Sequence, residues 1–254
     1  SRALYCHYKL KQFNQFEQKL KKVIGTKHTS PLLATLSNHY AVNFNKPDLY
    51  NFCPNPLEFV LHERVPELVH NNHKLRFDLL SDIEQTEISD RKQSRLYNGI
   101  QSSGNLFQRN EKSFQLLSLA LEKMIQKYYE MHQRSPCAFI KFFPKDIQFS
   151  SSWYVRMKQG GHLNSHIHED GWISGAVYLS IPKLRESPDE GAIELSTDGD
   201  NYPKQHNNFP KLTILPDEGD VIFFPSCVFH RTIAFNSNEE RICIAFDLKP
   251  SLKS

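Results

Sequence analysis

The spacing of apolar residues predicts that the first half of the chain is mainly helical. Between residues 5 and 24, apolar side chains recur every three or four positions with lysines between them, which is typical of an amphipathic helix that ends at Gly25. A second run of this kind covers residues 56–70. The clearest helix is expected at 111–133, where Asn110 is a suitable N-cap. No period among these helices indicates a repeat array.

From residue 138 onward the pattern changes to short strands. Runs of β-branched and aromatic residues alternate with Gly, Pro, Asn and Asp, which is typical of strands joined by turns. The predicted strands are 138–143, 149–158, 162–168, 173–181, 192–196, 211–215, 221–225, 228–235 and 242–248. Such a series favours a jelly-roll-like, cupin-like double sheet over a parallel α/β sheet. We therefore expect an α+β fold with N-terminal and flanking helices.

This pattern divides the chain into two parts. Residues 1–110 are expected to form a helical and irregular region that packs on the core, and residues 111–254 to form the β-rich core with one long supporting helix. Within the core, residues 198–210 contain three Asn, two Pro and one Gly. We expect this segment to be the most mobile loop and to lie over the mouth of the barrel.

Composition narrows the class of protein. The net charge of +3 comes from 31 basic and 28 acidic residues that are interspersed, which argues against a nucleic-acid-binding stripe. Five scattered Cys without a CxxC pair favour reduced thiols in a cytoplasmic protein. No apolar stretch approaches the ~20 residues of a spanning helix, so no membrane partner is expected. The first residue is Ser1 rather than Met, which is consistent with a fragment of a longer protein.

Residues that bind metals gather at the end of one predicted strand. His166 and His168 are two positions apart, so the strand repeat places both imidazoles on one face, and Asp170 follows just before Gly171. His230 lies near the start of a later strand. A non-haem Fe(II) site needs such imidazole and carboxylate ligands on one side of the ion. The metal-ligand candidates are therefore His166, His168, Asp170 and His230, and no other catalytic residue is predicted.

Arg241 begins the last predicted strand. A guanidinium is always charged and planar, so a barrel that encloses one is suited to binding a carboxylate through two parallel hydrogen bonds.

Two stretches carry a resemblance to a known family. Residues 160–168 (GGHLNSHIH), followed by 172–179 (WISGAVYL), resemble the 2-oxoglutarate- and Fe(II)-dependent oxygenases. The resemblance is closest to a bacterial group often joined to tetratricopeptide repeats, and more distant to aspartyl/asparaginyl β-hydroxylases and prolyl hydroxylases. Residues 99–107 (GIQSSGNLF) also resemble that bacterial group. The resemblance implies a double-stranded β-helix that uses Fe(II), O2 and 2-oxoglutarate, releases succinate and CO2, and is stimulated by ascorbate.

The resemblance leaves two ligand sets open. Prolyl hydroxylases have a Gly six residues before the iron-binding His of their His-x-Asp motif, as Gly160 stands before His166. In this register His168 takes the place of the carboxylate, which gives three His ligands, or two His and a water. The β-hydroxylases have a similar stretch and lack the carboxylate. If the strand is instead shifted by two residues, His168, Asp170 and His230 form the usual triad.

The resemblance also assigns the co-substrate residues and the reaction. It implies that Arg241 binds the distal carboxylate of 2-oxoglutarate, and that Ser174 and Tyr154 are further hydrogen-bonding candidates. Hydroxylation of a peptide or protein side chain, or of an amino-acid-like small molecule, is the expected reaction. The substrate candidates around the mouth are Trp172, Gln101 and Tyr202, with His206 and Phe209.

Two other functions remain open at this point. A cupin-like metal dioxygenase that does not use 2-oxoglutarate would also suit three His ligands. A non-catalytic double-sheet binding module would need no Arg facing a metal, so Arg241 distinguishes the three hypotheses.

Overall fold

Two helices form the N-terminal segment, where a single helix was predicted for residues 5–24. The computed structural model describes residues 1–26, 29–69, 73–85, 88–91 and 93–249. Helix α1 (Arg2–Lys9) and helix α2 (Phe13–Ile24) are separated at Lys11, whose φ is 59°. A left-handed residue of this kind cannot continue a right-handed helix. The two helices pack against each other and against the next helix through Tyr8, Phe16 and Leu36.

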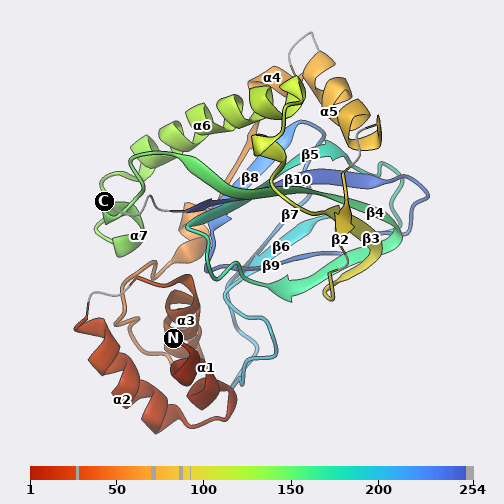
Figure 1. Cartoon of the computed structure of the whole chain (residues 1–254). Coiled ribbons are helices and arrows are strands. Elements are labelled where there is room, and N and C mark those ends of the chain that lie inside the picture. Colours follow the sequence, from red (N-terminus) through yellow and green to blue (C-terminus); the bar gives the residue numbers. More distant parts are fainter. Residues whose placement is uncertain (27–28, 70–72, 86–87, 92, 250–254) are drawn as a thin grey trace.

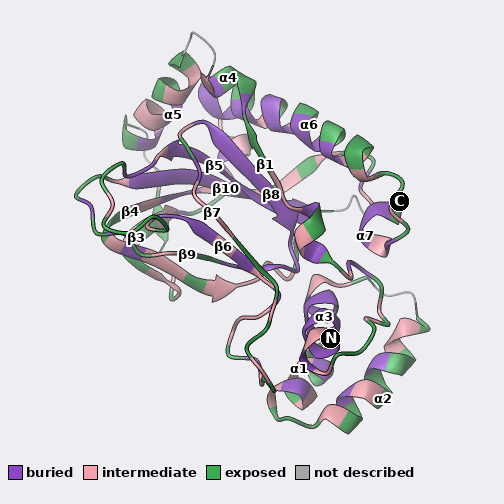
Figure 2. Cartoon of the chain, turned by 180° about the vertical axis from the view of Figure 1, so that it is seen from behind, coloured by how far each residue is buried: buried purple, intermediate pink, exposed green. Residues whose placement is uncertain are grey.

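Helix α3 (Pro31–Asn43) was not predicted from the sequence. Ser30 caps it by accepting a hydrogen bond from the backbone N–H of Leu33, and Pro31 occupies its first turn. Nearly all of its residues are buried, as Figure 2 shows along the whole helix. A helix that is buried all round lacks the apolar periodicity on which a sequence prediction depends.

The helix predicted for residues 56–70 is wrong. In its place the chain forms a 3-10 helix η1 (Pro56–Phe59), strand β1 (Leu61–Arg64) and a short helix α4 (Pro66–Val69), and residue 70 lies outside the described residues. Strand β1 pairs with a strand of the core, and this pairing outweighs the helical preference that the local spacing of apolar residues suggested. The elements that follow are α5 (Lys74–Gln85), β2 (Asp90–Arg91), β3 (Leu96–Ser102) and η2 (Leu106–Gln108).

The long helix predicted for residues 111–133 is confirmed as α6 (Lys112–His132). It begins after Glu111 rather than after Asn110, and its apolar face packs on the outer side of the sheet through Leu117, Leu121 and Ile125. The strand predicted for 138–143 is wrong, because this short apolar run forms helix α7 (Ala138–Lys141). Periodicity cannot tell a short buried helix from a strand.

One curled antiparallel sheet forms the core (Figure 1). Its strands run in the order β1-β8-β5-β10-β4-β9-β6-β7, and β3 pairs with both β2 and β4. The remaining strands are β4 (Gln148–His166), β5 (Ile173–Ser180), β6 (Ile193–Ser196), β7 (Lys211–Ile214), β8 (Asp220–Pro225), β9 (Phe229–Thr232) and β10 (Arg241–Lys249).

Strand β4 links the two layers of the curled sheet. Its first part pairs with β10, and its end pairs with β9, where Leu163 lies opposite Thr232 and His166 opposite His230. Two separate strands were predicted here, with a break at the glycines. Gly160 has a φ of 76°, so the glycine lets the strand bend without ending.

The sheet has a helical outer face and an apolar interior. In Figure 1, α5 and α6 cover the face of the layer that contains β5 and β10. The N-terminal helices α1, α2 and α3 lie on the opposite side of the sheet, below it in this view. A boundary at residue 110 does not separate helices from sheet, because β1 pairs with β8 and β3 pairs with β4.

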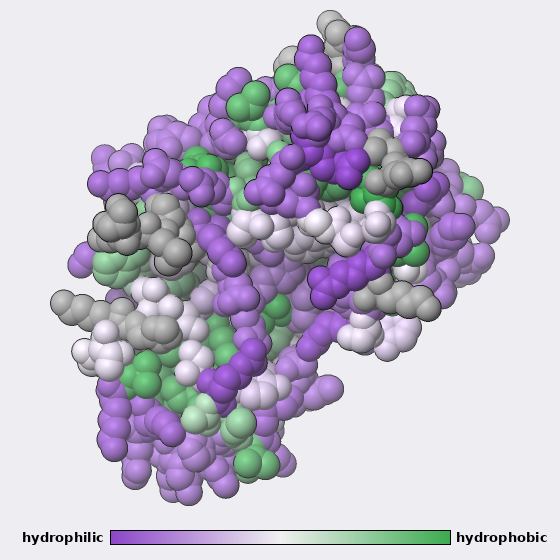
Figure 3. Space-filling view, viewed as in Figure 1, coloured by the Kyte–Doolittle hydropathy of each residue, from purple (hydrophilic) through white to green (hydrophobic). Residues whose placement is uncertain are grey.

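Hydrophilic residues cover most of the surface seen in Figure 3, with hydrophobic ones in scattered groups. No helix in the described part of the chain is long and apolar enough to cross a membrane.

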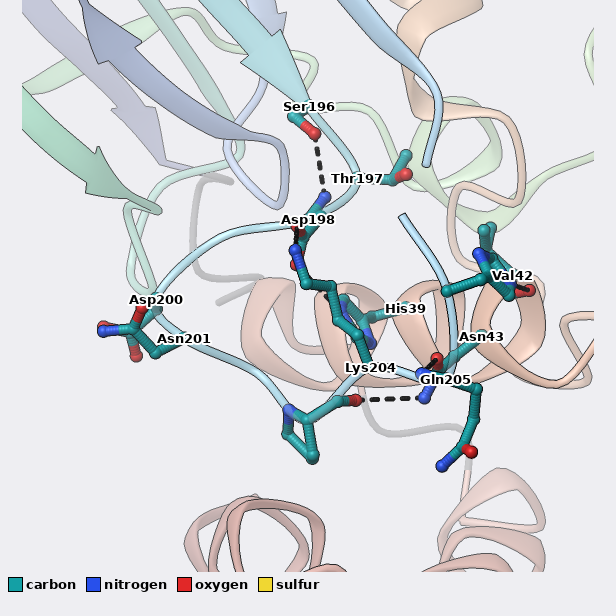
Figure 4. Close-up of polar contacts among 12 residues, drawn as sticks. His39, Val42, Asn43, Ser196, Thr197, Asp198, Asp200, Asn201, Lys204 and Gln205 are labelled. Atoms are coloured by element: carbon teal, nitrogen blue, oxygen red, sulfur yellow. Dashed lines mark hydrogen bonds and ion pairs between the residues drawn. The ribbon is translucent and has the colours of Figure 1, made fainter. Parts of the chain in front are cut away.

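The segment between β6 and β7 is fastened to α3, although residues 198–210 were expected to be mobile (Figure 4). Asp198 lies 3.1 Å from Nε2 of His39 and 2.7 Å from Nζ of Lys204. The side chain of Asn43 donates to the carbonyl of Pro203 at 3.0 Å and accepts from the backbone N–H of Gln205 at 2.7 Å. The polar residues that suggested mobility are therefore used as anchors.

Candidate metal centre

Three histidines from two neighbouring strands meet inside the barrel. His166 ends β4, His168 follows it, and His230 lies on β9 directly opposite His166 in the strand register. Of the described residues, these three form the only group of three or more His, Cys, Asp or Glu whose ligand atoms all lie within 4.8 Å of one another. The sequence prediction that these distant residues come together is thus matched by the geometry.

The hydrogen bonds of the three rings leave the same nitrogen free on each. Nδ1 of His166 donates to the carbonyl of Asn164 at 2.9 Å, and Nδ1 of His230 donates to the carbonyl of Val228 at 3.3 Å. Nδ1 of His168 lies 2.6 Å from a carboxylate oxygen of Asp247, to which it donates. Each ring therefore has Nε2 available as a ligand, in an orientation that its Nδ1–H contact fixes.

The spacing of these nitrogens fits one ion. Nε2 of His166 and Nε2 of His168 are 3.3 Å apart. Two imidazoles that bind one metal at right angles, with bonds of about 2.1 Å, have their nitrogens roughly 3 Å apart. Imidazole suits Fe(II), Zn(II), Cu(II) and Ni(II), so the donor set fits the predicted iron without being restricted to it.

Burial keeps two of these rings in the form that binds metals. Burial, together with a smaller effect of the neighbouring His168, lowers the pKa of His166 to about 4. Burial also lowers the pKa of His230 well below its usual value, helped by the other two histidines. Because both rings are neutral at pH 7, no proton has to leave before a metal binds.

Asp170 is not part of this group. It lies exposed in the turn after His168, and the structure does not bring its carboxylate among the three ligand nitrogens. The strand register that places His166 opposite His230 instead favours the three-histidine set.

A carboxylate that the sequence analysis missed lies behind His168. Asp247 is on β10, 79 positions from His168. Burial alone would raise the pKa of Asp247, but His168 and the hydroxyls of Ser174 and Ser151 outweigh that effect and lower it. The available signal was an acidic residue inside an otherwise apolar strand, which is unusual unless the charge has partners.

Ser174 belongs to this arrangement rather than to a co-substrate site. Its hydroxyl donates to the carboxylate of Asp247 at 2.6 Å and lies 2.8 Å from the hydroxyl of Ser226. It does not line the cavity that the histidines face. In place of the predicted hydrogen bond to 2-oxoglutarate, the structure shows Ser174 in a contact behind the three histidines.

The histidines face a cavity of about 240 Å³ that also contains Arg241. Arg241 is 2% exposed, and its Nε donates to the carbonyl of Gly191 at 2.9 Å. Its guanidinium carbon lies 5.1 Å from the centre of the Tyr178 ring. Among the described residues that line the cavity, Arg91 and Arg241 are charged and none is acidic. The cavity therefore favours an anionic ligand.

Tyr178 is a second residue that the sequence analysis missed. Its hydroxyl is buried in the cavity wall and has no hydrogen-bond partner within the described part of the chain. Burial raises the pKa of Tyr178, so this hydroxyl stays protonated and can donate to an anion beside Arg241. A carboxylate bound in this part of the cavity would accept the hydrogen bond that this unpaired hydroxyl can donate.

Tyr154, which was predicted for this role, faces the other side of the sheet. Its hydroxyl donates to Asp90 at 2.7 Å, whereas its strand neighbours Trp153 and Val155 line the cavity. Successive residues of a strand point to opposite faces, so Tyr154 cannot share the cavity with both neighbours.

The predicted substrate residues are divided between the cavity and the core. Gln101 lines the cavity at its exposed end, together with Gln93 and Arg91. Trp172 is buried in the outer core, where its indole N–H donates to the carbonyl of Phe139 at 3.0 Å. Tyr202 is buried among the aromatic residues of the N-terminal helices, and His206 and Phe209 lie against α3. The aromatic residues predicted to contact substrate are therefore packing residues in this structure.

Comparison with known proteins was made by sequence and by structure. A family model described as "Putative 2OG-Fe(II) oxygenase" matches residues 151–247, the segment that contains the three histidines, Arg241 and Asp247. A search of curated proteins found no matching sequence.

Several solved structures share the fold. The chain is similar to a prolyl-4-hydroxylase from Pseudomonas putida, with 10% identity, a TM-score of 0.53, and coverage of 79% of this chain and 96% of that one. It is similar to HygX from Streptomyces hygroscopicus with nickel, 2-oxoglutarate and hygromycin B bound, with 13% identity, a TM-score of 0.52, and coverage of 77% and 84%. A prolyl hydroxylase from Trichoplax adhaerens, in complex with a hypoxia inducible factor peptide fragment, has 13% identity, a TM-score of 0.50, and coverage of 84% and 89%.

At these identities the structural likeness concerns the fold, and it confirms the predicted double-stranded β-helix. The family match adds the enzyme class, and its Fe(II) and 2-oxoglutarate agree with the predicted cofactors and with the three histidines. Residues 151–247 of the chain therefore match the model of a family of 2-oxoglutarate- and Fe(II)-dependent oxygenases.

Proposed function

We propose that the protein is a hydroxylase in which His166, His168 and His230 hold Fe(II), and Arg241 and Tyr178 hold 2-oxoglutarate. The observation that carries this proposal is that three convergent imidazole nitrogens and a buried guanidinium line one cavity without an acidic residue among its described lining. When bound, Fe(II) and 2-oxoglutarate supply oxygen activation with release of succinate and CO2.

The chain's own residues bind and orient these groups. Arg241 neutralises the distal carboxylate of 2-oxoglutarate, and the Tyr178 hydroxyl donates a hydrogen bond to the same carboxylate. Apolar side chains such as Val155, Met157 and Phe224 line the cavity and exclude water from it. A dry cavity strengthens the charge interaction and protects the reaction from side reactions with solvent.

We propose that the substrate is a peptide or protein side chain, or an amino-acid-like small molecule. The exposed end of the cavity carries the amides of Gln93 and Gln101 and the guanidinium of Arg91. Amide side chains match the donors and acceptors of a peptide bond, and a guanidinium matches a carboxylate. Among the similar structures, one contains a peptide fragment and another contains the small molecule hygromycin B, which is consistent in kind with a peptide or a small molecule as substrate.

Two observations argue against the other functions. A dioxygenase that does not use 2-oxoglutarate does not need a buried guanidinium and an unpaired buried hydroxyl in the cavity wall. A binding module does not need three ring nitrogens that are each held free by an Nδ1–H contact.

The test measures succinate formed from 2-oxoglutarate in the presence of Fe(II), ascorbate and O2. Wild-type protein is expected to form succinate slowly without substrate and faster with a peptide or amino-acid substrate found by screening. The Arg156→Met variant serves as a matched control, because Arg156 lies next to this region on β4 but pairs with Glu240 at 2.6 Å instead of lining the cavity.

The outcomes separate the three functions. Tight 2-oxoglutarate binding that depends on Arg241, together with succinate formation, supports the proposal. Metal binding with O2 consumption but no dependence on 2-oxoglutarate would favour the cupin-like dioxygenase. Metal binding without O2 consumption in any screen would favour the binding module.

A further inference from the structure

Asp247 occupies an unusual position for a charged residue. It lies on β10 between Phe246 and Leu248, which are both fully buried, and its own side chain is 14% exposed. Its carboxylate oxygen Oδ1 lies 2.6 Å from Nδ1 of His168. A carboxylate in such surroundings is costly unless its charge is used by a partner.

Strand pairing holds this carboxylate in one orientation. The register of the sheet places Asp247 opposite Ser174 on β5 and opposite Ser151 on β4. The hydroxyl of Ser174 donates to Oδ1 at 2.6 Å, and the hydroxyl of Ser151 donates to Oδ2 at 3.2 Å. Both oxygens of Asp247 are therefore held from flanking strands, and the side chain cannot turn away from His168.

The backbone beside Asp247 is shaped to fit this arrangement. A Cβ atom added at Gly171 would lie 2.4 Å from the hydroxyl oxygen of Ser226 and 3.2 Å from Oδ1 of Asp247. The chain therefore passes the side chains of Ser226 and Asp247 at a distance that only glycine allows without a shift in them. The region behind His168 is therefore closely packed.

His168 is the ligand candidate that is treated differently from the other two. Nδ1 of His166 and Nδ1 of His230 donate to neutral backbone carbonyls, whereas Nδ1 of His168 donates to a carboxylate. His168 also stands where the usual triad of such enzymes has a carboxylate ligand. Three neutral imidazoles give the ion no negative charge, and the described lining of the cavity contains no acidic residue.

We propose that Asp247 is a positioning residue that supplies, through the ring of His168, the negative charge that the three-histidine centre lacks. It holds the proton of His168 on Nδ1, so that Nε2 points to the metal, and it makes that nitrogen a stronger donor. The inference rests on the proposed function, because it requires that the three histidines bind a metal.

The test compares metal affinity in the wild type and in Asp247→Asn. Asparagine keeps an oxygen that can accept from Nδ1 but removes the charge. Under anaerobic conditions, titration with Fe(II) and with Co(II) is expected to give an affinity about 10–100-fold weaker than that of the wild type. The visible absorption bands of bound Co(II), which report the donor strength of its ligands, are expected to shift in the variant.

Asp220→Asn is the matched control. Asp220 is also a buried carboxylate bonded to a histidine, since its Oδ2 lies 2.7 Å from Nε2 of His62, but it does not line the cavity. Its replacement is expected to lower the stability of the fold while leaving metal affinity and the Co(II) spectrum unchanged. This control therefore distinguishes the effect of losing any buried Asp–His hydrogen bond from a specific effect of Asp247 on metal binding.

The outcomes are distinguishable. If the wild type binds neither Fe(II) nor Co(II) at the histidines, the proposed function fails. If the wild type binds metal and Asp247→Asn binds it within threefold with the same Co(II) spectrum, the role of Asp247 is refuted. Should Asp247→Asn not fold, Ser174→Ala, which removes one donor to the same carboxylate, is expected to alter the Co(II) spectrum, and an unchanged spectrum would refute the inference.

Discussion

Replacement of Arg241 provides the sharpest test of how this cavity holds a co-substrate. The Arg241 guanidinium is 2% exposed and lies against Tyr178, so a carboxylate bound to it would be withdrawn from water. Removal of one member of a buried, hydrogen-bonded charge pair costs about 2–5 kcal/mol. Taking about 3 kcal/mol for Arg241→Ala, we expect the Kd of 2-oxoglutarate to rise ~150-fold.

Metal affinity should respond differently to the same change. Arg241 contacts Gly191 and Tyr178 rather than the imidazoles, so we expect Arg241→Ala to bind Fe(II) within threefold of the wild type. Arg241→Lys keeps the charge but loses the planar pair of donors. Its Kd for 2-oxoglutarate should therefore lie between those of the wild type and Arg241→Ala, about tenfold above the wild-type value.

The assay is anaerobic calorimetric titration of the metal-loaded protein with 2-oxoglutarate. Arg241→Met, which fills more of the vacated volume, guards against a result that reflects a collapsed core, and thermal unfolding of each variant verifies the fold. If Arg241→Ala and Arg241→Met both bind 2-oxoglutarate as tightly as the wild type, the assignment of Arg241 is refuted.

Three further changes test other parts of the structure. His230→Ala removes one of three nitrogens that lie within 4.8 Å of one another and should abolish measurable Fe(II) binding in an anaerobic titration; retained affinity would contradict the ligand set. Tyr178→Phe removes the unpaired hydroxyl and should raise the Kd of 2-oxoglutarate about 10–150-fold by calorimetry, as expected for a hydrogen bond to a charged group. Burial lowers the pKa of His39 to about 4 from 6.5, so the unfolded chain takes up this proton first as the pH falls. The contribution of His39 to the free energy of unfolding should therefore be constant above about pH 6.5 and fall by about 3 kcal/mol towards pH 4. Urea unfolding at several pH values should show a smaller loss of stability over this range in His39→Gln than in the wild type.

The sequence alone predicted the fold class and the three histidines that the structure brings together. The series of short β-branched and aromatic runs separated by turn residues predicted the double sheet, and the helical repeat of residues 111–133 predicted α6. The spacing of His166 and His168 placed both rings on one face of a strand. These predictions succeeded because periodicity is a local property that each segment carries by itself.

Only the tertiary structure decided which side chains face the cavity and what lies behind the three histidines. Tyr154 and Ser174 have suitable hydroxyls, but the sheet turns the first towards Asp90 and the second towards Asp247. Tyr178 became a candidate only when its hydroxyl was found buried without a partner among the described residues. In each case the deciding fact is the presence or absence of a contact with residues far away in the chain. The register of β10 with β4 and β5 brings Asp247 to His168 across 79 positions, and no local pattern encodes that pairing.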